Sequence, residues 1–372
     1  MSLALRTLLY DWRRFLPAVV AVAFSGLLVL MQAAIILGIF SLSSLYVTRS
    51  QADLWIGSPG VQSVDLGRPL APRAELFTWM NPHVRRVEPF LWGSGEWRTR
   101  DRGMVNVYIV GVDVRPDAMA LADALPPDLR AAIAPPGSVL VDQADLHKLQ
   151  VRVGDLAEIN GHRVRVAGVT HGLRGLGGVN AIASLQTTRA LDPAAGADGR
   201  AAYLLVQLDA PSNARGVAAS LNAGAGRRSM EAQTAEGFAR RTTAYWLVES
   251  GAGVGFVLGS LVALLVAVII TSQTLAAAVA GSLKEYAALR ALGFPMSTLR
   301  RIVLAQSGWV GAAGLAAAAA LGLLLVLAAR AGSAPVVVSA PMMAAAGALV
   351  MATALASGLF ALRRVGEADP AV

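Results

Sequence analysis

The sequence has no cysteine among its 372 residues, and charged residues make up only 15% of it. The lack of cysteine excludes disulfide bonds, thiolate metal sites and cysteine nucleophiles, although it does not identify the redox compartment. An ordinary soluble domain is about a quarter charged. Because hydrophobic residues reach 55% here, the composition indicates a membrane protein.

Known catalytic motifs are also missing. No G-x-x-x-x-G-K-[ST] or G-x-S-x-G pattern occurs, and "GLRGLGG" does not match the dinucleotide-binding pattern. Of the four histidines (His83, His147, His162 and His171), the last two are nine residues apart around a predicted hairpin. That is no recognised metal-ligand spacing, so solvated or hydrogen-bonded histidines are favoured over a metal site. We therefore expect no catalytic residue, metal or cofactor in this chain.

Four apolar runs are long enough to span a bilayer, which takes about 20 residues; they are 17–47, 246–280, 302–329 and 335–362. The first run could be a cleaved signal peptide. It is much longer than the about 7–15 residues of a signal-peptide core, so an uncleaved signal-anchor is favoured.

Basic residues flank these runs unevenly. The net charge is +8, which could indicate a nucleic-acid partner, but the ends of the apolar runs explain it better. Lys and Arg gather at 6–14, 284–301 and 363–364, whereas the connection after the third run has only Arg330 at its edge. By the positive-inside rule, both termini and the 281–301 loop are predicted in the cytoplasm, with 48–245 outside.

The segment 48–245 is mixed in polarity and predicts an α+β domain. Asn160-Gly161 is a strong two-residue hairpin signal, so two strands are expected within 156–170. Further strands are predicted at 105–113, 138–142 and 201–209, with a helix at 212–224. The glycine-rich stretch 170–184 is predicted to be a loop.

Two features of the second run suggest function. Gly251, Gly255 and Gly259 are spaced by four and would lie on one helix face, where another backbone could approach closely; Gly253 lies off that stripe, so glycines without a packing role are an equal alternative. Glu249 is either a functional intramembrane charge or an interfacial residue wetted by headgroups, and the second is favoured. The third run adds Gly308, Gly311 and Gly314, and also suits tight packing.

The loop 281–301, "GSLKEYAALRALGFPMSTLRR", is longer than a simple turn requires. Residues 283–292 favour a helix, Gly293 stands where a left-handed residue ends one, and Pro295 prevents continuation. Ser297 is expected to cap the next helix. Alone, the segment could be an interfacial amphipathic helix that only anchors the chain.

The stretch "KEYAALRALGFPMSTLRRIVLAQS" resembles the cytoplasmic loop of MacB/FtsX-type ABC transporter permeases. The order of one helix, a large external domain and three helices also fits that family. "GSVLVDQADLHKLQVRVGDLAEINGHRVRVAGV" is similar to the family's external-domain pattern. Within the family, "ADLWIGSPGVQSVDLG" and the tail "ALRRVGEADPAV" resemble the DevC-like branch.

This resemblance implies a division of labour. A separate ABC ATPase would bind ATP and Mg, and the helix at 283–292 would insert into it as a coupling helix. Leu289 and Leu292 would make the apolar contacts, Glu285 and Arg290 the charged ones, and Gly293 would end the helix. The amphipathic N-terminal segment would brace the same contact.

The resemblance also implies further partners and a place in the cell. A second copy of the chain would form a homodimer in a bacterial inner membrane, with a periplasmic adaptor (membrane-fusion) protein and an outer-membrane channel, exporting an amphiphilic cargo by mechanotransmission. The alternatives are an FtsX-like device that regulates an extracytoplasmic partner without transport, and a membrane-anchored sensor or scaffold without an ATPase. The resulting organisation is a cytoplasmic amphipathic helix (1–16), transmembrane helix 1 (17–47), a periplasmic α+β domain (48–245), transmembrane helix 2 (246–280), a coupling loop (281–301), transmembrane helices 3 (302–329) and 4 (335–362), and a cytoplasmic tail (363–372).

Overall fold

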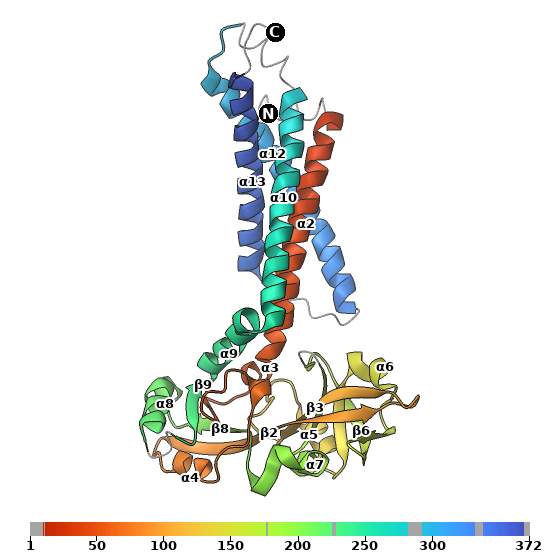
Figure 1. Cartoon of the computed structure of the whole chain (residues 1–372), viewed down its shortest axis with the longest axis vertical. Coiled ribbons are helices and arrows are strands. Elements are labelled where there is room, and N and C mark those ends of the chain that lie inside the picture. Colours follow the sequence, from red (N-terminus) through yellow and green to blue (C-terminus); the bar gives the residue numbers. More distant parts are fainter. Residues whose placement is uncertain are drawn as a thin grey trace. The chain divides into compact units, whose positions relative to one another are not determined.

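The computed structural model describes residues 10, 12–175, 178–224, 228–281, 292–331 and 338–367. The chain divides into two compact units. A membrane unit combines residues 1–38 and 255–372, and an external unit contains residues 39–254. Figure 1 shows long helices in the first and a sheet with short helices in the second.

In the described part of the membrane unit the long helices (Figure 1) are α2 (Trp12–Ser43), α10 (Gly251–Gly281), α12 (Met296–Ala331) and α13 (Ala340–Glu367). Each contains a stretch long and apolar enough to cross a bilayer, at Phe15–Ser43, Gly253–Ala278, Ser297–Ala329 and Ala340–Leu359. The prediction of four membrane helices is confirmed. Only 11% of the span in α10 is buried inside the chain, against 28–33% in the other three, so α10 has the most uncovered surface.

Glycines set the closest helix contacts within this unit. A Cβ built on Gly314 of α12 would stand 2.6 Å from the Val22 side chain of α2, and one on Gly311 would stand 2.9 Å from the Met351 sulfur of α13. Gly308 is looser, with its nearest neighbour at 4.0 Å. The predicted tight packing of the third run is therefore confirmed at Gly311 and Gly314.

Strands in the external unit form one nine-stranded sheet in the described part of the chain, ordered β3-β7-β4-β6-β5-β2-β8-β1-β9. Their bounds are β1 (Leu54–Gly57), β2 (Val84–Arg98), β3 (Met104–Val112), β4 (Ser138–Asp142), β5 (Leu156–Ile159), β6 (His162–Thr170), β7 (Val179–Ser184), β8 (Tyr203–Leu208) and β9 (Glu231–Thr234). The long strand β2 belongs to both halves. Its first part pairs with β8, and its second part pairs with β3 and β5. Because β2 also pairs with β3, the strands β3, β7, β4, β6, β5 and β2 form a closed ring.

Short helices complete the external unit and make its fold α+β, as predicted. They are α3 (Leu45–Thr48), α4 (Ala74–Trp79), α5 (Pro127–Ile133), α6 (Leu146–Leu149), α7 (Leu185–Leu191), α8 (Ala214–Ala223) and α9 (Ala235–Ala244). Short 3-10 helices, including η1 (Val64–Leu66), and a π-helical turn, η5 (Tyr245–Glu249), join them.

The hairpin prediction is confirmed and one loop prediction is wrong. Asn160 and Gly161 have φ of +50° and +81°, which suits a type I′ turn, and Ile159 pairs with His162 across it. The stretch 170–184 contains β7, whose six residues are all buried. This strand pairs with β3 and β4, so both its edges are hydrogen-bonded. The glycines that precede it in the sequence led to the incorrect prediction of a loop.

Candidate functional site

Two segments link the sheet to the membrane helices along the chain. Helix α3 follows α2, and α9 with η5 precedes α10. Helices α3 and α9 lie against one another. The polypeptide therefore enters and leaves the external unit through adjacent segments.

Both segments pack into one aromatic cluster. The ring of Trp55 on β1 lies 5.3 Å from Phe90, 5.5 Å from Tyr203 and 5.9 Å from Phe238 of α9, measured between ring centroids. Tyr46 of α3 lies 5.9 Å from Phe90. All five side chains are buried. Aromatic pairs of this kind add about 0.5–1.5 kcal/mol each beyond burial, so α3 and α9 are held by the same core.

Hydrogen bonds fix η5 to this core as well. The indole N–H of Trp246 donates to Ser63 Oγ and to Asp65 Oδ1, both at 3.1 Å. Tyr203 Oη donates to the backbone carbonyls of Ser63 and Val64 at 3.0 and 2.9 Å. The turn at η1 is thus held between the sheet and the segment that leads into α10.

A sharp turn joins η5 to α10. The Ser250 N–H donates to the Tyr245 carbonyl at 2.9 Å, which closes the π-turn, and Ser250 Oγ accepts from the Gly253 N–H at 3.0 Å, as an N-cap does. A Cβ on Gly253 would overlap the backbone of Trp246 and Leu247. The turn therefore requires glycine at position 253. This explains why a glycine stands there although it lies off the predicted stripe.

The stripe itself contacts nothing in the described part of the chain. A Cβ on Gly251, Gly255 or Gly259 would meet no atom within 4 Å. The face is open for another molecule, and its role in a dimer stays a prediction. Glu249 is exposed at the end of η5, outside α10.

The coupling loop is only partly described. Glu285, Leu289 and Arg290 fall in 282–291, outside the described residues. Leu292 is 76% exposed, and Gly293 has φ of +87°, so the left-handed conformation predicted for it is confirmed.

The capping prediction for the helix after this loop is wrong. Helix α12 begins at Met296, so Ser297 is its second residue rather than its cap. The Pro295 carbonyl accepts from the Thr298 N–H at 2.9 Å instead. Proline is tolerated at the start of a helix because the N–H group that it lacks would have no acceptor within the helix.

Uncharged polar side chains join α2 to α10 at membrane depth. Thr271 Oγ1 donates to Ser25 Oγ at 3.1 Å, and Ser25 Oγ donates to the Ala267 carbonyl at 3.2 Å. Gln32 Nε2 donates to Ser260 Oγ at 3.0 Å. Such bonds between membrane helices contribute about 0.6–2 kcal/mol. The sequence reasoning considered only charged groups inside the spans and missed these contacts.

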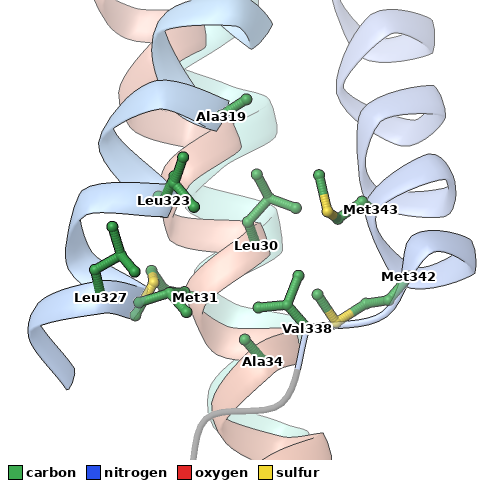
Figure 2. Close-up of a pocket in the computed structure, with 11 residues that line it drawn as sticks. Leu30, Met31, Ala34, Ala319, Leu323, Leu327, Val338, Met342 and Met343 are labelled. Atoms are coloured by element: carbon green, nitrogen blue, oxygen red, sulfur yellow. The ribbon is translucent and has the colours of Figure 1, made fainter. Parts of the chain in front are cut away.

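An apolar cavity of about 180 Å³ lies between α2, α12 and α13 (Figure 2). Leu30, Met31 and Ala34 line it from α2, and Met342 and Met343 line it from α13. Its position within the predicted spans makes it a candidate site for an apolar ligand.

Two buried charged side chains, Glu88 and Arg130, bind the backbone of one loop of the external unit. Glu88 on β2 is fully buried and accepts from the N–H groups of Met119 and Ala120 at 2.7 and 2.9 Å. Burial raises the pKa of Glu88, against the lowering effect of those bonds and of Arg86. Arg130, also buried, donates to the Ala120 carbonyl at 2.5 Å. These charges hold a loop in place and have a structural rather than a chemical role.

Metal-binding residues do not cluster where the chain is described: no group of three or more His, Asp or Glu could hold an ion there. His162 and His171 are exposed and separated by the length of β6.

Comparisons with known proteins agree with the two-unit architecture. Residues 16–223 match the family model of the MacB-like periplasmic core domain, and residues 257–370 match that of the FtsX-like permease C-terminal region. No curated protein sequence matches the chain.

Solved structures similar to this chain include two extracytoplasmic domains. The periplasmic region of MacB from Actinobacillus actinomycetemcomitans has 12% identity and a TM-score of 0.34, over 51% of this chain and 92% of that one. The extracellular domain of the noncanonic ABC-type transporter YknZ from Gram-positive bacteria has 10% identity and a TM-score of 0.34, over 49% of this chain and 99% of that one. The matched family models cover both units, and the chain therefore belongs to the MacB/FtsX-type family of ABC transporter permeases.

Proposed function

We propose that this chain is the permease subunit of an export complex in a bacterial inner membrane, driven by a separate ABC ATPase that binds ATP and Mg. The distribution of Lys and Arg supports cytoplasmic termini and a cytoplasmic 281–301 loop. The external unit would then face the periplasm. The permease itself would carry no catalytic step.

The coupling helix at 283–292 is the proposed contact with the ATPase. Leu289 and Leu292 would enter an apolar groove, with Glu285 and Arg290 at its rim. The exposure of Leu292 and the left-handed Gly293 support a segment that ends sharply and presents an apolar side chain at the surface.

The observation that carries this proposal is the shared core of α3 and α9. Tyr46 and Phe238 contact one aromatic cluster, and Trp246 is tied to η1. Two segments held by one buried core move together more easily than separately, because parting them would expose that core to water. ATP-driven movement of the membrane helices would then reach the sheet as one displacement.

Partners beyond the ATPase follow from the same hypothesis. A second copy would pack on the face of Gly251, Gly255 and Gly259, and the large uncovered surface of α10 supports this. A periplasmic adaptor and an outer-membrane channel would complete a DevC-like exporter of an amphiphilic cargo. The external unit is the proposed adaptor contact.

The turn at Gly253 offers a direct test of the mechanical link. In Gly253→Ala the new Cβ would overlap the backbone of Trp246 and Leu247, whereas in Gly347→Ala, a control in α13 outside the glycine stripe, it would meet nothing within 4 Å. Each variant would be reconstituted with the ATPase. The ATP-dependent change in the protease sensitivity of its external unit would then be measured. We expect Gly253→Ala to abolish that change while ATPase binding persists, and Gly347→Ala to retain it. Equal responses would contradict the proposal.

An FtsX-like regulator is the second candidate. It is favoured by the lining of two cavities in the described membrane unit, which is wholly apolar in one and apolar except for Gln32 and Ser260 in the other. Cells lacking the permease would distinguish the two functions. If the permease is an exporter, its cargo stays in the periplasm of these cells. If it is a regulator, export is intact and an extracytoplasmic partner is inactive.

A further inference from the structure

The cavity between α2, α12 and α13 has the lining of a hydrocarbon site. Figure 2 shows Leu30 and Met31 of α2 between Leu323 and Leu327 of α12 on one side and Met342 and Met343 of α13 on the other. All eleven lining residues are apolar. Three of them are methionines, whose flexible side chains adapt to ligands of irregular shape.

The volume of this cavity suits part of one acyl chain rather than a whole lipid molecule. The volume is about 180 Å³. Cavities of about 150 Å³ lined by Leu, Ile and Phe exclude water and bind molecules the size of benzene. The cavity therefore accommodates a short run of methylene groups and disfavours water.

The cavity is continuous with the surface that the helices present to the bilayer. Leu323, Leu327 and Met343 line it and are still 61%, 55% and 45% exposed. These side chains thus face the cavity and the outside of the membrane unit together. Because the surrounding solvent of a membrane helix is lipid hydrocarbon, the molecule that reaches this opening is an acyl chain.

We propose that this cavity binds a segment of one acyl chain of a bilayer phospholipid, which enters sideways from the membrane. The proposal depends on the position of the cavity within the spans and goes beyond the export function. It holds whether the permease exports a cargo or regulates a partner.

Gly322 of α12 offers a way to fill the cavity. It lines the cavity, and a Cβ on it would stand 3.7 Å from Leu27 Cδ1, an ordinary contact. Gly322→Ala is therefore tolerated, and Gly322→Leu places a larger side chain in the space. Gly347 of α13 is the matched control, because a Cβ there meets nothing within 4 Å and Gly347 does not line the cavity.

The test uses full-length permease in vesicles of phosphatidylethanolamine and phosphatidylglycerol with a trace of phospholipid carrying a diazirine in mid-chain. After illumination, adducts are mapped by mass spectrometry. We expect adducts at Met31 and Met342 above those at Leu265, an exposed residue of α10. They should fall stepwise in Gly322→Ala and Gly322→Leu and stay unchanged in Gly347→Leu.

Other outcomes would overturn the proposal. Equal labelling of Met31 and Leu265 would mean ordinary contact with surrounding lipid, and no labelling of Met31 would mean a closed or self-filled cavity. If Gly322→Leu fails to assemble, Gly322→Ala still decides the matter, because its labelling must lie below that of the unchanged protein. A free fatty acid carrying the same diazirine gives the second arm: labelling by the fatty acid alone would contradict a phospholipid source.

Discussion

Gly314 is the position where one added methyl group should disturb the membrane unit most clearly. In Gly314→Ala the new Cβ would stand 2.6 Å from the Val22 side chain and 3.1 Å from the Val19 carbonyl oxygen. Backbone and a β-branched side chain cannot yield easily, so α2 and α12 would have to separate. Overpacking of this kind costs about 1–3 kcal/mol.

The same change at Gly308 separates packing from helix propensity. Both positions lie in α12, and glycine to alanine inside a helix by itself stabilises by roughly 0.5–1 kcal/mol. At Gly308 the nearest atom, Leu355 Cδ2, would be 4.0 Å from the new Cβ, so only that gain remains. Subtracting one variant from the other leaves the packing cost alone, about 1–3 kcal/mol.

Thermal unfolding of the purified protein in detergent, followed by tryptophan fluorescence, measures this difference. Gly314→Ala should unfold at a lower temperature than the unchanged protein, and Gly308→Ala at an equal or higher one. If the two variants unfolded together, the close contact between α2 and α12 would be refuted.

Three further predictions concern topology, titration and self-association. A cysteine replacing His162 should react with an impermeant thiol reagent in intact spheroplasts and one replacing Ala288 should not; the reverse pattern would refute the topology. Burial raises the pKa of Glu88, so its contribution to stability is complete below its unfolded pKa of about 4.3 and is lost as the pH rises through the folded value. Thermal unfolding across pH should therefore show the unchanged protein losing stability relative to Glu88→Gln as pH rises, and parallel curves would count against this. Gly255→Leu should weaken disulfide cross-linking between paired cysteines along 247–262, and unchanged cross-linking would show that the stripe is incidental.

The membrane helices could be predicted from sequence because each is a continuous apolar run, and hydrocarbon leaves a helix as the way to satisfy its backbone. The hairpin at Asn160-Gly161 was equally clear, since few sequences favour two successive positive φ values. Strand β2 was missed, because its sequence VRRVEPFLWGSGEWR mixes charges, a proline and glycines. Its first part pairs with β8 and its second part with β3 and β5. The strand therefore has no single alternation of apolar and polar residues along its length.

The candidate site was predictable only in part. Gly293 followed from the local chemistry of helix ends, and its conformation agrees. The role of Gly253 was not visible, because it depends on a π-turn that brings the Trp246 carbonyl back towards α10. The aromatic cluster joins residues as distant in sequence as Tyr46 and Phe238, and periodicity within one segment does not reveal such contacts.

Leu289→Asp tests the central claim most directly. A buried leucine truncated to alanine costs about 2–5 kcal/mol, and a carboxylate in the same groove would cost more because a charge would be desolvated. The measurement is co-purification of the ATPase with the permease from membranes, with ATP hydrolysis assayed on the same samples. We expect Leu289→Asp to lose the ATPase while the protein still inserts and its external unit stays protease-resistant. If the ATPase binds and hydrolyses ATP as before, the segment 283–292 is only a membrane-surface anchor, and the account of coupling is contradicted.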